Sequence, residues 1–79
     1  MIQYSTKEMR EIIEEHPVNE LEGLIDQYIH HERNRKLLKR RLLDGVCFEP
    51  LAEEFDLTPR QCKNIVKECQ KIVFEHLLP

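Results

Sequence analysis

The sequence predicts an all-α domain of four or five helices that ends in a C-terminal helix-turn-helix. Its apolar residues recur at spacings of three and four, as on the buried face of a helix, and do not alternate as they would in a strand. A chain of 79 residues with 41% apolar and 34% charged residues fits one globular domain rather than a disordered segment. Within it we expect an acidic N-terminal helical segment, residues 1–32, and a helix-turn-helix module, residues 33–79.

Two helices are expected in the N-terminal segment. Ser5-Thr6-Lys7-Glu8 fits a capping box, in which Ser5 caps the first turn and Glu8 reaches back. Pro17 disfavours helical geometry at His16, so the first helix should end there. Asn19 can cap the second helix. The apolar stripes of these two helices comprise Met9, Ile12 and Ile13, then Leu21, Leu24, Ile25, Tyr28 and Ile29.

The central segment, residues 20–43, permits two interpretations. Leu42 and Leu43 return to the helix face of Leu24 and Ile25 after five full turns, which allows one continuous helix. A polar stretch interrupts the stripe, however, and a break near Arg33-Asn34 with Asn34 as a cap is equally consistent. In both cases Asp44-Gly45 should end the helix, because glycine favours the left-handed conformation needed there.

A short helix over Glu49–Phe55, with Phe48 just before it and Pro50 in its first turn, should form the first half of the helix-turn-helix. Thr58 as N-cap and Pro59 at the first helical position then predict a last helix over residues 59–73. Ala52 supplies the small residue at the turn, and Leu57 can fill the space between the two helices. The expected buried stripe of the last helix is Cys62, Ile65, Val66, Cys69, Ile72 and Val73, continued by Phe74, Leu77 and Leu78.

Several classes of protein are disfavoured. With three cysteines, no C-x-x-C pair and no signal peptide, we expect a reduced, cytoplasmic protein, and no apolar run is long enough to span a membrane. The four histidines match no zinc-site spacing, so we interpret them as surface residues and expect no metal or other cofactor. Cys62 and Cys69 lie on the apolar stripe and are interpreted as core residues. No catalytic grouping of residues stands out, and we do not expect an enzyme.

The charge is divided unevenly along the chain. Residues 1–29 hold two Lys and Arg against seven Asp and Glu, a net charge of −5, whereas residues 30–79 carry a net charge of +2. This asymmetry indicates a nucleic-acid surface in the second half. The alternative is a solvated helix face that binds nothing. The densest basic run, RNRKLLKRR, contains Arg33, Arg35, Lys36, Lys39, Arg40 and Arg41, of which some should approach DNA and the rest should pair with the acidic segment.

Basic and amide side chains also lie directly after the turn that precedes the predicted last helix. In a helix-turn-helix the second helix lies in the major groove with its N-terminal residues at the base edges. Arg can contact guanine, and Asn or Gln adenine, while Lys commonly meets phosphate. We therefore expect base contacts from Arg60, Gln61 and Asn64, and phosphate contacts from Thr58, Lys63, Lys67, Lys71, Arg40 and Arg41.

The segment LLDGVCFEPLAEEFDLTPRQCKNI resembles region four of bacterial sigma factors and the small sigma-region-four-like proteins of Firmicutes phages and mobile elements. The matching features are the LLDG turn, the AEEF frame, DLT before the last helix and RQCKNI at its start. The resemblance covers about residues 33–77. It implies that the last helix reads promoter DNA, with Arg60 and Asn64 at the base-contacting positions and Gln61 and Lys63 beside them. Pro59 departs from the polar or basic residue frequent in the family.

From these features we expect a sequence-specific DNA-binding regulator of transcription whose partner is double-stranded DNA. The alternative is an interaction module that engages RNA polymerase or another regulator without binding DNA. A single recognition helix reads few base pairs, so we also expect a homodimer paired through the apolar stripes of residues 1–29. The competing arrangement folds those stripes back onto Phe74, Leu77 and Leu78 within one chain.

Overall fold

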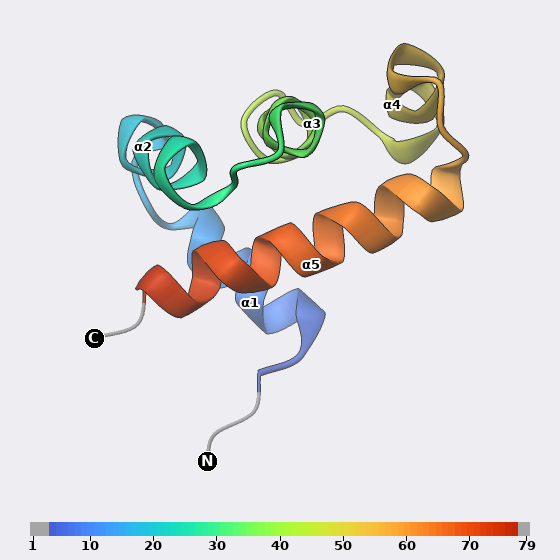
Figure 1. Cartoon of the computed structure of the whole chain (residues 1–79). Helices are drawn as coiled ribbons and strands as arrows, with labels where there is room; N and C mark the ends of the chain where they lie inside the picture. The colour runs from blue at the N-terminus through green and yellow to red at the C-terminus, as the bar shows by residue number, and fades with distance from the viewer. Residues whose placement is uncertain (1–3, 78–79) are drawn as a thin grey trace.

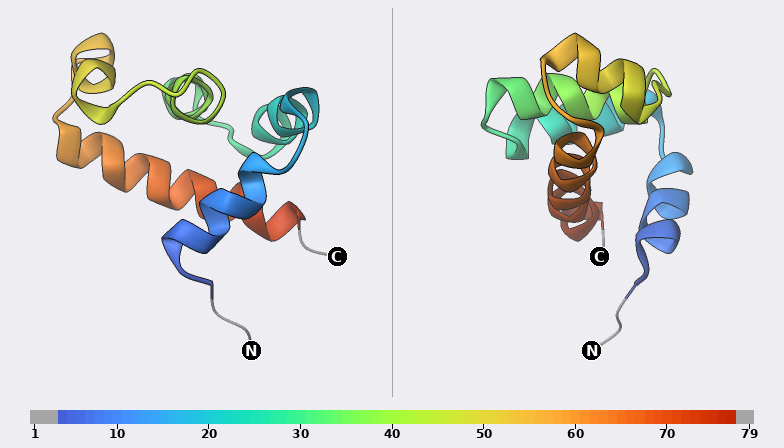
Figure 2. Two further views of the ribbon diagram at one scale, coloured as in Figure 1. Left: turned by 180° about the vertical axis from the view of Figure 1, so that it is seen from behind. Right: turned by 90° about the vertical axis from the view of Figure 1, so that its right-hand side faces the viewer.

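The computed structural model describes residues 4–77, which form five α-helices and no strand, as Figure 1 shows. The helices are α1 (Thr6–Glu14), α2 (Val18–Tyr28), α3 (Glu32–Leu42), α4 (Phe48–Phe55) and α5 (Pro59–Leu77). The predicted all-α class is confirmed. The longest helix, α5, runs beneath the layer formed by α2, α3 and α4, and α1 lies along its side (Figure 2). All four other helices pack on α5.

The start of α1 confirms the predicted capping box. The Ser5 hydroxyl accepts a hydrogen bond from the Glu8 amide at 3.1 Å, and the Glu8 carboxylate accepts one from the Ser5 amide at the same distance. The bond from the Ser5 amide, which favours the charged carboxylate, is the largest cause that lowers the pKa of Glu8. The helix ends at Glu14, two residues before the predicted end at His16. The prediction that Asn19 caps α2 is wrong, because α2 begins at Val18 with Pro17 in the N-cap position and no side-chain cap.

The central segment is broken, not continuous. The backbone leaves the helical conformation at Ile29, and α3 begins after His31, which occupies its N-cap position. The break therefore precedes Asn34, which does not cap α3 and accepts hydrogen bonds from the Arg33 guanidinium. Ile29 is buried at the break, so the turn itself contributes to the core and allows α3 to pack beside α2.

The core is built around the apolar face of α5. Seven large side chains drawn from all five helices are fully buried: Ile13, Ile25, Leu37, Leu38, Leu51, Cys62 and Val73. Burying a side chain such as Leu or Ile contributes about 1.5–3 kcal/mol, so these contacts dominate the stability of so short a chain. Ile72 was expected in this stripe but is 38% exposed, because it lies about 100° around the helix from Val73. Ile65 is only half-buried, whereas Gln70, a polar residue, is buried.

The apolar residues of the N-terminal segment fold back onto α5 within one chain. The rings of Tyr4 and Phe74 meet edge to face with centroids 4.9 Å apart, and Tyr28 stacks on His76 at 3.5 Å. Ile13 and Ile25 are fully buried. Of the residues predicted to join two copies, Ile13, Leu21, Ile25 and Ile29 are buried within one chain, whereas Met9, Ile12, Leu24 and Tyr28 are partly exposed. Leu78, part of the competing arrangement, lies outside the described residues.

Within residues 4–77 no helix has the length and apolar character needed to cross a membrane.

Candidate nucleic-acid interface

The connection between α4 and α5 is short and tightly bonded. Asp56 ends α4 in the left-handed conformation with φ 55°, a region in which Asp is found more often than most residues. The amides of Asp56 and Leu57 donate to the carbonyls of Glu53 and Ala52, which ends the helix. Ala52 is buried and Leu57 packs half-buried against the core, as expected of both. The connection therefore fixes the direction in which α5 begins.

The first turn of α5 carries a second capping box. The Thr58 hydroxyl accepts from the Gln61 amide at 3.1 Å, and the Gln61 side-chain oxygen accepts from the Thr58 amide at 2.9 Å. Thr58 is the predicted cap, and its T-x-x-Q spacing is the signal from which the role of Gln61 could have been predicted. Reading adenine by a paired contact needs both polar atoms of the Gln61 amide. The expected base contact would therefore cost the cap its second hydrogen bond.

The exposed face of α5 gathers the other residues predicted there. Arg60, Lys63, Asn64, Lys67 and Lys71 recur at helical spacing and all are exposed. No carboxylate of the described residues lies within 4.0 Å of these four cationic groups. We call Arg60, Lys63, Asn64, Lys67 and Lys71 the α5 face. Glu68 and Glu75 stand on one flank of it and limit its positive charge.

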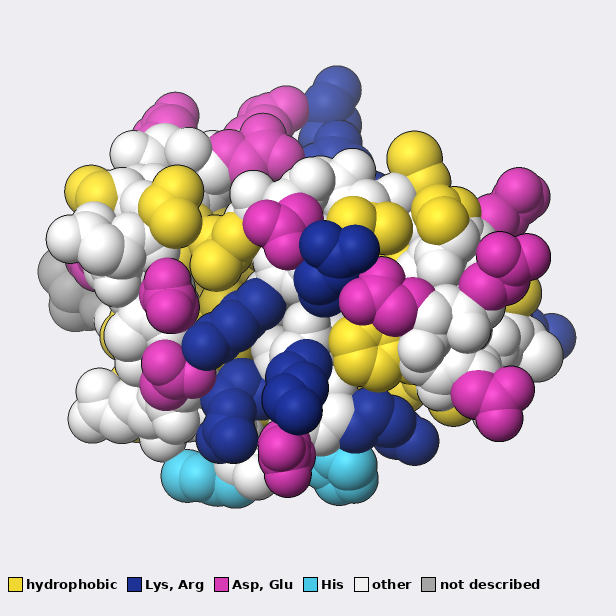
Figure 3. All heavy atoms as spheres, turned by 90° about the horizontal axis from the view of Figure 1, so that it is seen from above, with side chains coloured by type: hydrophobic (Ala, Val, Ile, Leu, Met, Phe, Trp, Pro, Cys, Tyr) yellow, Lys and Arg dark blue, Asp and Glu magenta, His cyan; other side chains and the backbone are white. Residues whose placement is uncertain are grey.

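The basic run on α3 has a different environment. We call it the α3 run, and it comprises Arg33, Arg35, Lys36, Lys39, Arg40 and Arg41. Lys39 lies 2.6 Å from a carboxylate oxygen of Asp26, Arg35 approaches the same carboxylate at 3.8 Å, and Lys36 lies 3.1 Å from Glu32. The view from above in Figure 3 shows Lys and Arg gathered over α3 with Asp and Glu interspersed among them. The pairing of Arg35 and Lys39 with Asp26 confirms the expectation that part of the run would meet the acidic N-terminal segment.

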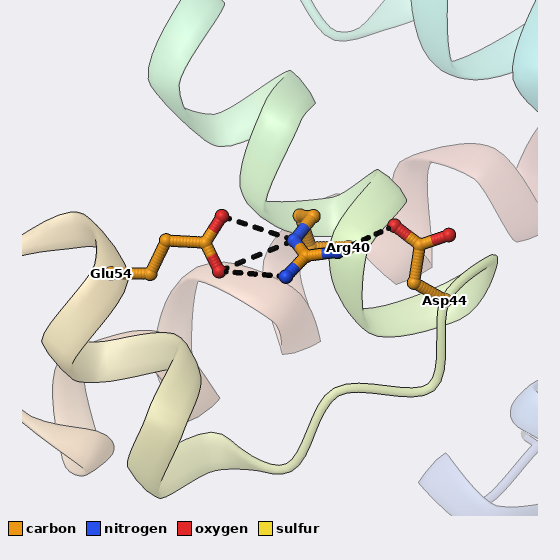
Figure 4. Close-up of polar contacts among 3 residues, drawn as sticks. All are labelled: Arg40, Asp44 and Glu54. Carbon is orange, nitrogen blue, oxygen red and sulfur yellow. Dashed lines mark hydrogen bonds and ion pairs between the residues drawn. The ribbon is translucent and has the colours of Figure 1, made fainter.

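Arg40, predicted to contact phosphate, is held by two carboxylates. Its guanidinium donates to both oxygens of Glu54 at 3.0–3.2 Å and to Asp44 at 3.0 Å, so that α3 is bridged to α4 (Figure 4). These bonds, that to Glu54 foremost, raise the pKa of Arg40. A phosphate would have to displace one of these carboxylates, which argues against the role predicted for Arg40.

Arg41, its neighbour, turns in another direction. Its guanidinium lies 4.2 Å from the centre of the Phe48 ring and donates to the Val46 carbonyl at 3.0 Å. The Lys63 ammonium approaches the same ring at 5.7 Å. Phe48 thus holds one cation from α3 and one from α5, an attraction between positive charge and the face of an aromatic ring. This pairing could not be predicted from the sequence, because it depends on how α3, α4 and α5 meet.

Arg41, Phe48 and Lys63 border a groove of about 390 Å³ between α1 and α5, which we call the α1–α5 groove. Two lysines of the α5 face, Lys63 and Lys67, line it, and so does Arg41. On the opposite side α1 adds Arg10 and Glu14, which were not predicted to belong to any site. The complete lining is Arg10, Glu14, Arg41, Leu42, Gly45, Phe48, Lys63, Val66, Lys67 and Gln70.

The other reactive side chains do not converge. Cys62 and Cys69 are buried as predicted, and burial raises the pKa of both thiols, whereas Cys47 is exposed. No set of three His, Cys, Asp or Glu side chains in the described part of the chain could hold a metal ion. Comparison with protein-family models, curated proteins and solved structures finds no match for this chain.

Proposed function

We propose that this protein binds double-stranded DNA in a sequence-specific manner and regulates transcription. In this proposal α4 and α5 act as a helix-turn-helix, and α5 is the recognition helix that enters the major groove. The observation that carries the proposal is the α5 face, with four cationic groups that have no carboxylate partner among the described residues. Exposed Arg, Lys and Asn side chains near the start of a recognition helix can donate to phosphates and base edges.

The residues divide into two roles. Arg60 and Asn64 lie one turn apart near the start of α5, where a recognition helix meets base edges, and they suit guanine and adenine respectively. Lys63, Lys67 and Lys71 are suited to flanking phosphates. The sequence resemblance to sigma-factor region four supports the same division, because it places Arg60 and Asn64 at base-contacting positions.

The alternative is a module that binds RNA polymerase or another regulator without DNA. It is favoured by the net charge of −3 and by the ion pairs that occupy much of the α3 run. An acidic protein is repelled by DNA at long range, so binding would have to depend on local charge alone.

Titration of the protein against labelled random and genomic DNA separates these functions. Phosphate contacts from Lys63, Lys67 and Lys71 predict that affinity falls about 40-fold between about 50 mM and about 200 mM salt. Preference for some genomic fragments over random DNA would support base reading. If no DNA binds at about 50 mM salt, where phosphate contacts are strongest, the proposal fails and the alternative stands.

A homodimer remains part of the proposal, since two-fold pairing of recognition helices is a common source of specificity. Because Ile13 and Ile25 are fully buried in one chain, these two side chains are not available for pairing. Sedimentation equilibrium tests this: a mass of 9.5 kDa at all concentrations of the free protein, together with one chain per duplex in the complex, would exclude it.

A further inference from the structure

We infer that the α1–α5 groove binds a backbone phosphate of the DNA, and that Arg10 of α1 is one of its ligands. This inference rests on the proposed function and extends it to a helix outside the segment that resembles sigma region four. The groove is lined by cations from three elements: Arg10 from α1, Arg41 from α3, and Lys63 and Lys67 from α5. Among the described residues, Glu14 supplies the one carboxylate that borders it.

The groove is continuous with the α5 face. Lys63 and Lys67 belong to both, and each lies three residues beyond a predicted base-reading residue, Arg60 and Asn64. Residues three apart on a helix lie side by side. DNA whose bases meet Arg60 and Asn64 would therefore carry its flanking backbone past Lys63 and Lys67, at the opening of the groove.

Two of the cations are already oriented before any ligand binds. The contact of Arg41 with Phe48 and the Val46 carbonyl fixes its guanidinium, and Lys63 shares the same ring. Holding like charges together is unfavourable unless an anion joins them. A phosphate satisfies them with charge-assisted hydrogen bonds, and Leu42, Phe48 and Val66 offer apolar surface to the adjoining sugar.

Glu14 sets the strength of the site. Its carboxylate lies 3.9 Å from Arg10, and the two side chains are 62% and 47% exposed, so this ion pair is weak and a phosphate can displace it. Glu14 also repels the incoming phosphate directly. Removing its charge should therefore strengthen DNA binding, whereas removing the charge of Arg10 should weaken it.

Four variants of the full chain test these assignments with matched controls. Arg10→Gln is compared with Lys7→Gln, and Glu14→Gln with Glu11→Gln, because each pair makes the same charge change on α1 and the control residue does not line the groove. Truncation is unsuitable, since α1 carries the fully buried Ile13. Circular dichroism confirms folding, and the native count of fast-reacting thiols should stay at one, Cys47.

Binding to random duplex DNA is measured over a range of salt. Arg10→Gln should weaken binding about fivefold to tenfold near 100 mM salt and lower the salt slope by about 1, while Lys7→Gln changes affinity less than about twofold. Glu14→Gln should strengthen binding about threefold, clearly more than Glu11→Gln. These results would support the inference.

Two results would overturn it in different ways. If the wild type binds DNA but each variant equals its control, only the net charge of α1 matters and the groove holds no phosphate, while the proposed function stands. If the wild type binds no DNA and instead binds a poly-glutamate peptide that Arg10→Gln releases, the groove accepts an acidic protein segment. That outcome would also refute the proposed function.

Discussion

Helices α3 and α5 present two different kinds of positive charge. The α3 run is the most basic stretch of the sequence, yet Arg35, Lys36, Lys39 and Arg40 all have carboxylate partners. The four cations of the α5 face are spread over twelve residues and have none in the described part of the chain. The local density of Lys and Arg is therefore a poor guide to which cations are available to an anion.

The cause is the position of each helix. α3 packs between α2 and α4, and both neighbours present acidic side chains, Glu22 and Asp26 from α2 and Glu54 from α4. The exposed side of α5 points away from that layer (Figure 2). We therefore regard α3 as the helix that braces the fold and α5 as the helix available to a ligand, and the following predictions test that division.

The largest effect, a loss of stability, should follow truncation of a buried side chain of α3. Leu38 is fully buried, and Leu38→Ala should lower the free energy of unfolding by about 2–5 kcal/mol through lost burial and a residual cavity. Urea unfolding measures this loss. Val18→Ala, at a residue 58% exposed, is the control and should change stability little. Near-equal losses for both would mean that α3 is not packed as described.

Base reading should depend on the start of α5. Arg60→Ala or Asn64→Ala should each cost about 1–3 kcal/mol of binding free energy on the preferred site and little on random DNA. Neither should alter stability much, because both side chains are exposed. Equal losses on preferred and random DNA would reduce these residues to nonspecific contacts.

The cap of α5 should make a smaller contribution to folding. Thr58→Ala removes the oxygen that accepts from the Gln61 amide and should lower stability by about 1 kcal/mol. Thr58→Ser keeps an oxygen in that position and should restore most of the loss. Thermal unfolding followed by circular dichroism distinguishes them, and identical melting temperatures for both variants would show that the cap contributes nothing.

The smallest effect on DNA should come from Arg40. Arg40→Gln removes the guanidinium that pairs with both Asp44 and Glu54, so the melting temperature should fall slightly. DNA affinity should change less than about twofold, because a cation with its own carboxylate partners releases few counterions from DNA. A loss as large as that expected for a lysine of the α5 face would restore Arg40 as a phosphate contact.

Several local signals predicted helix ends correctly, although the cap predicted at Asn19 was wrong. The capping box at Ser5, the cap at Thr58, the left-handed Gly45 and the first-turn position of Pro50 all depend on neighbours within four residues. The end of α2 does not, because the burial of Ile29 against other helices sets it. For this reason the predicted break lay too close to Asn34.

The candidate site was less predictable for the same reason. The exposed residues of α5 follow from helical periodicity, which placed Arg60, Asn64 and Lys67 on one face. The partners of Arg40, the contact between Arg41 and Phe48, and the approach of Arg10 require α1, α3 and α4 to be positioned in space. No spacing within the sequence encodes those contacts.

Two double variants of equal charge distinguish DNA binding at the α5 face from binding at the α3 run. Lys63→Gln with Lys67→Gln removes two positive charges from α5, and Lys36→Gln with Lys39→Gln removes two from α3. The salt dependence of binding to random duplex DNA is measured for both. The α5 pair should lower the salt slope by about 2 and the affinity near 100 mM salt by roughly 50-fold, while the α3 pair leaves the slope unchanged. Equal slopes for the two variants, or a larger loss for the α3 pair, would contradict binding at the α5 face.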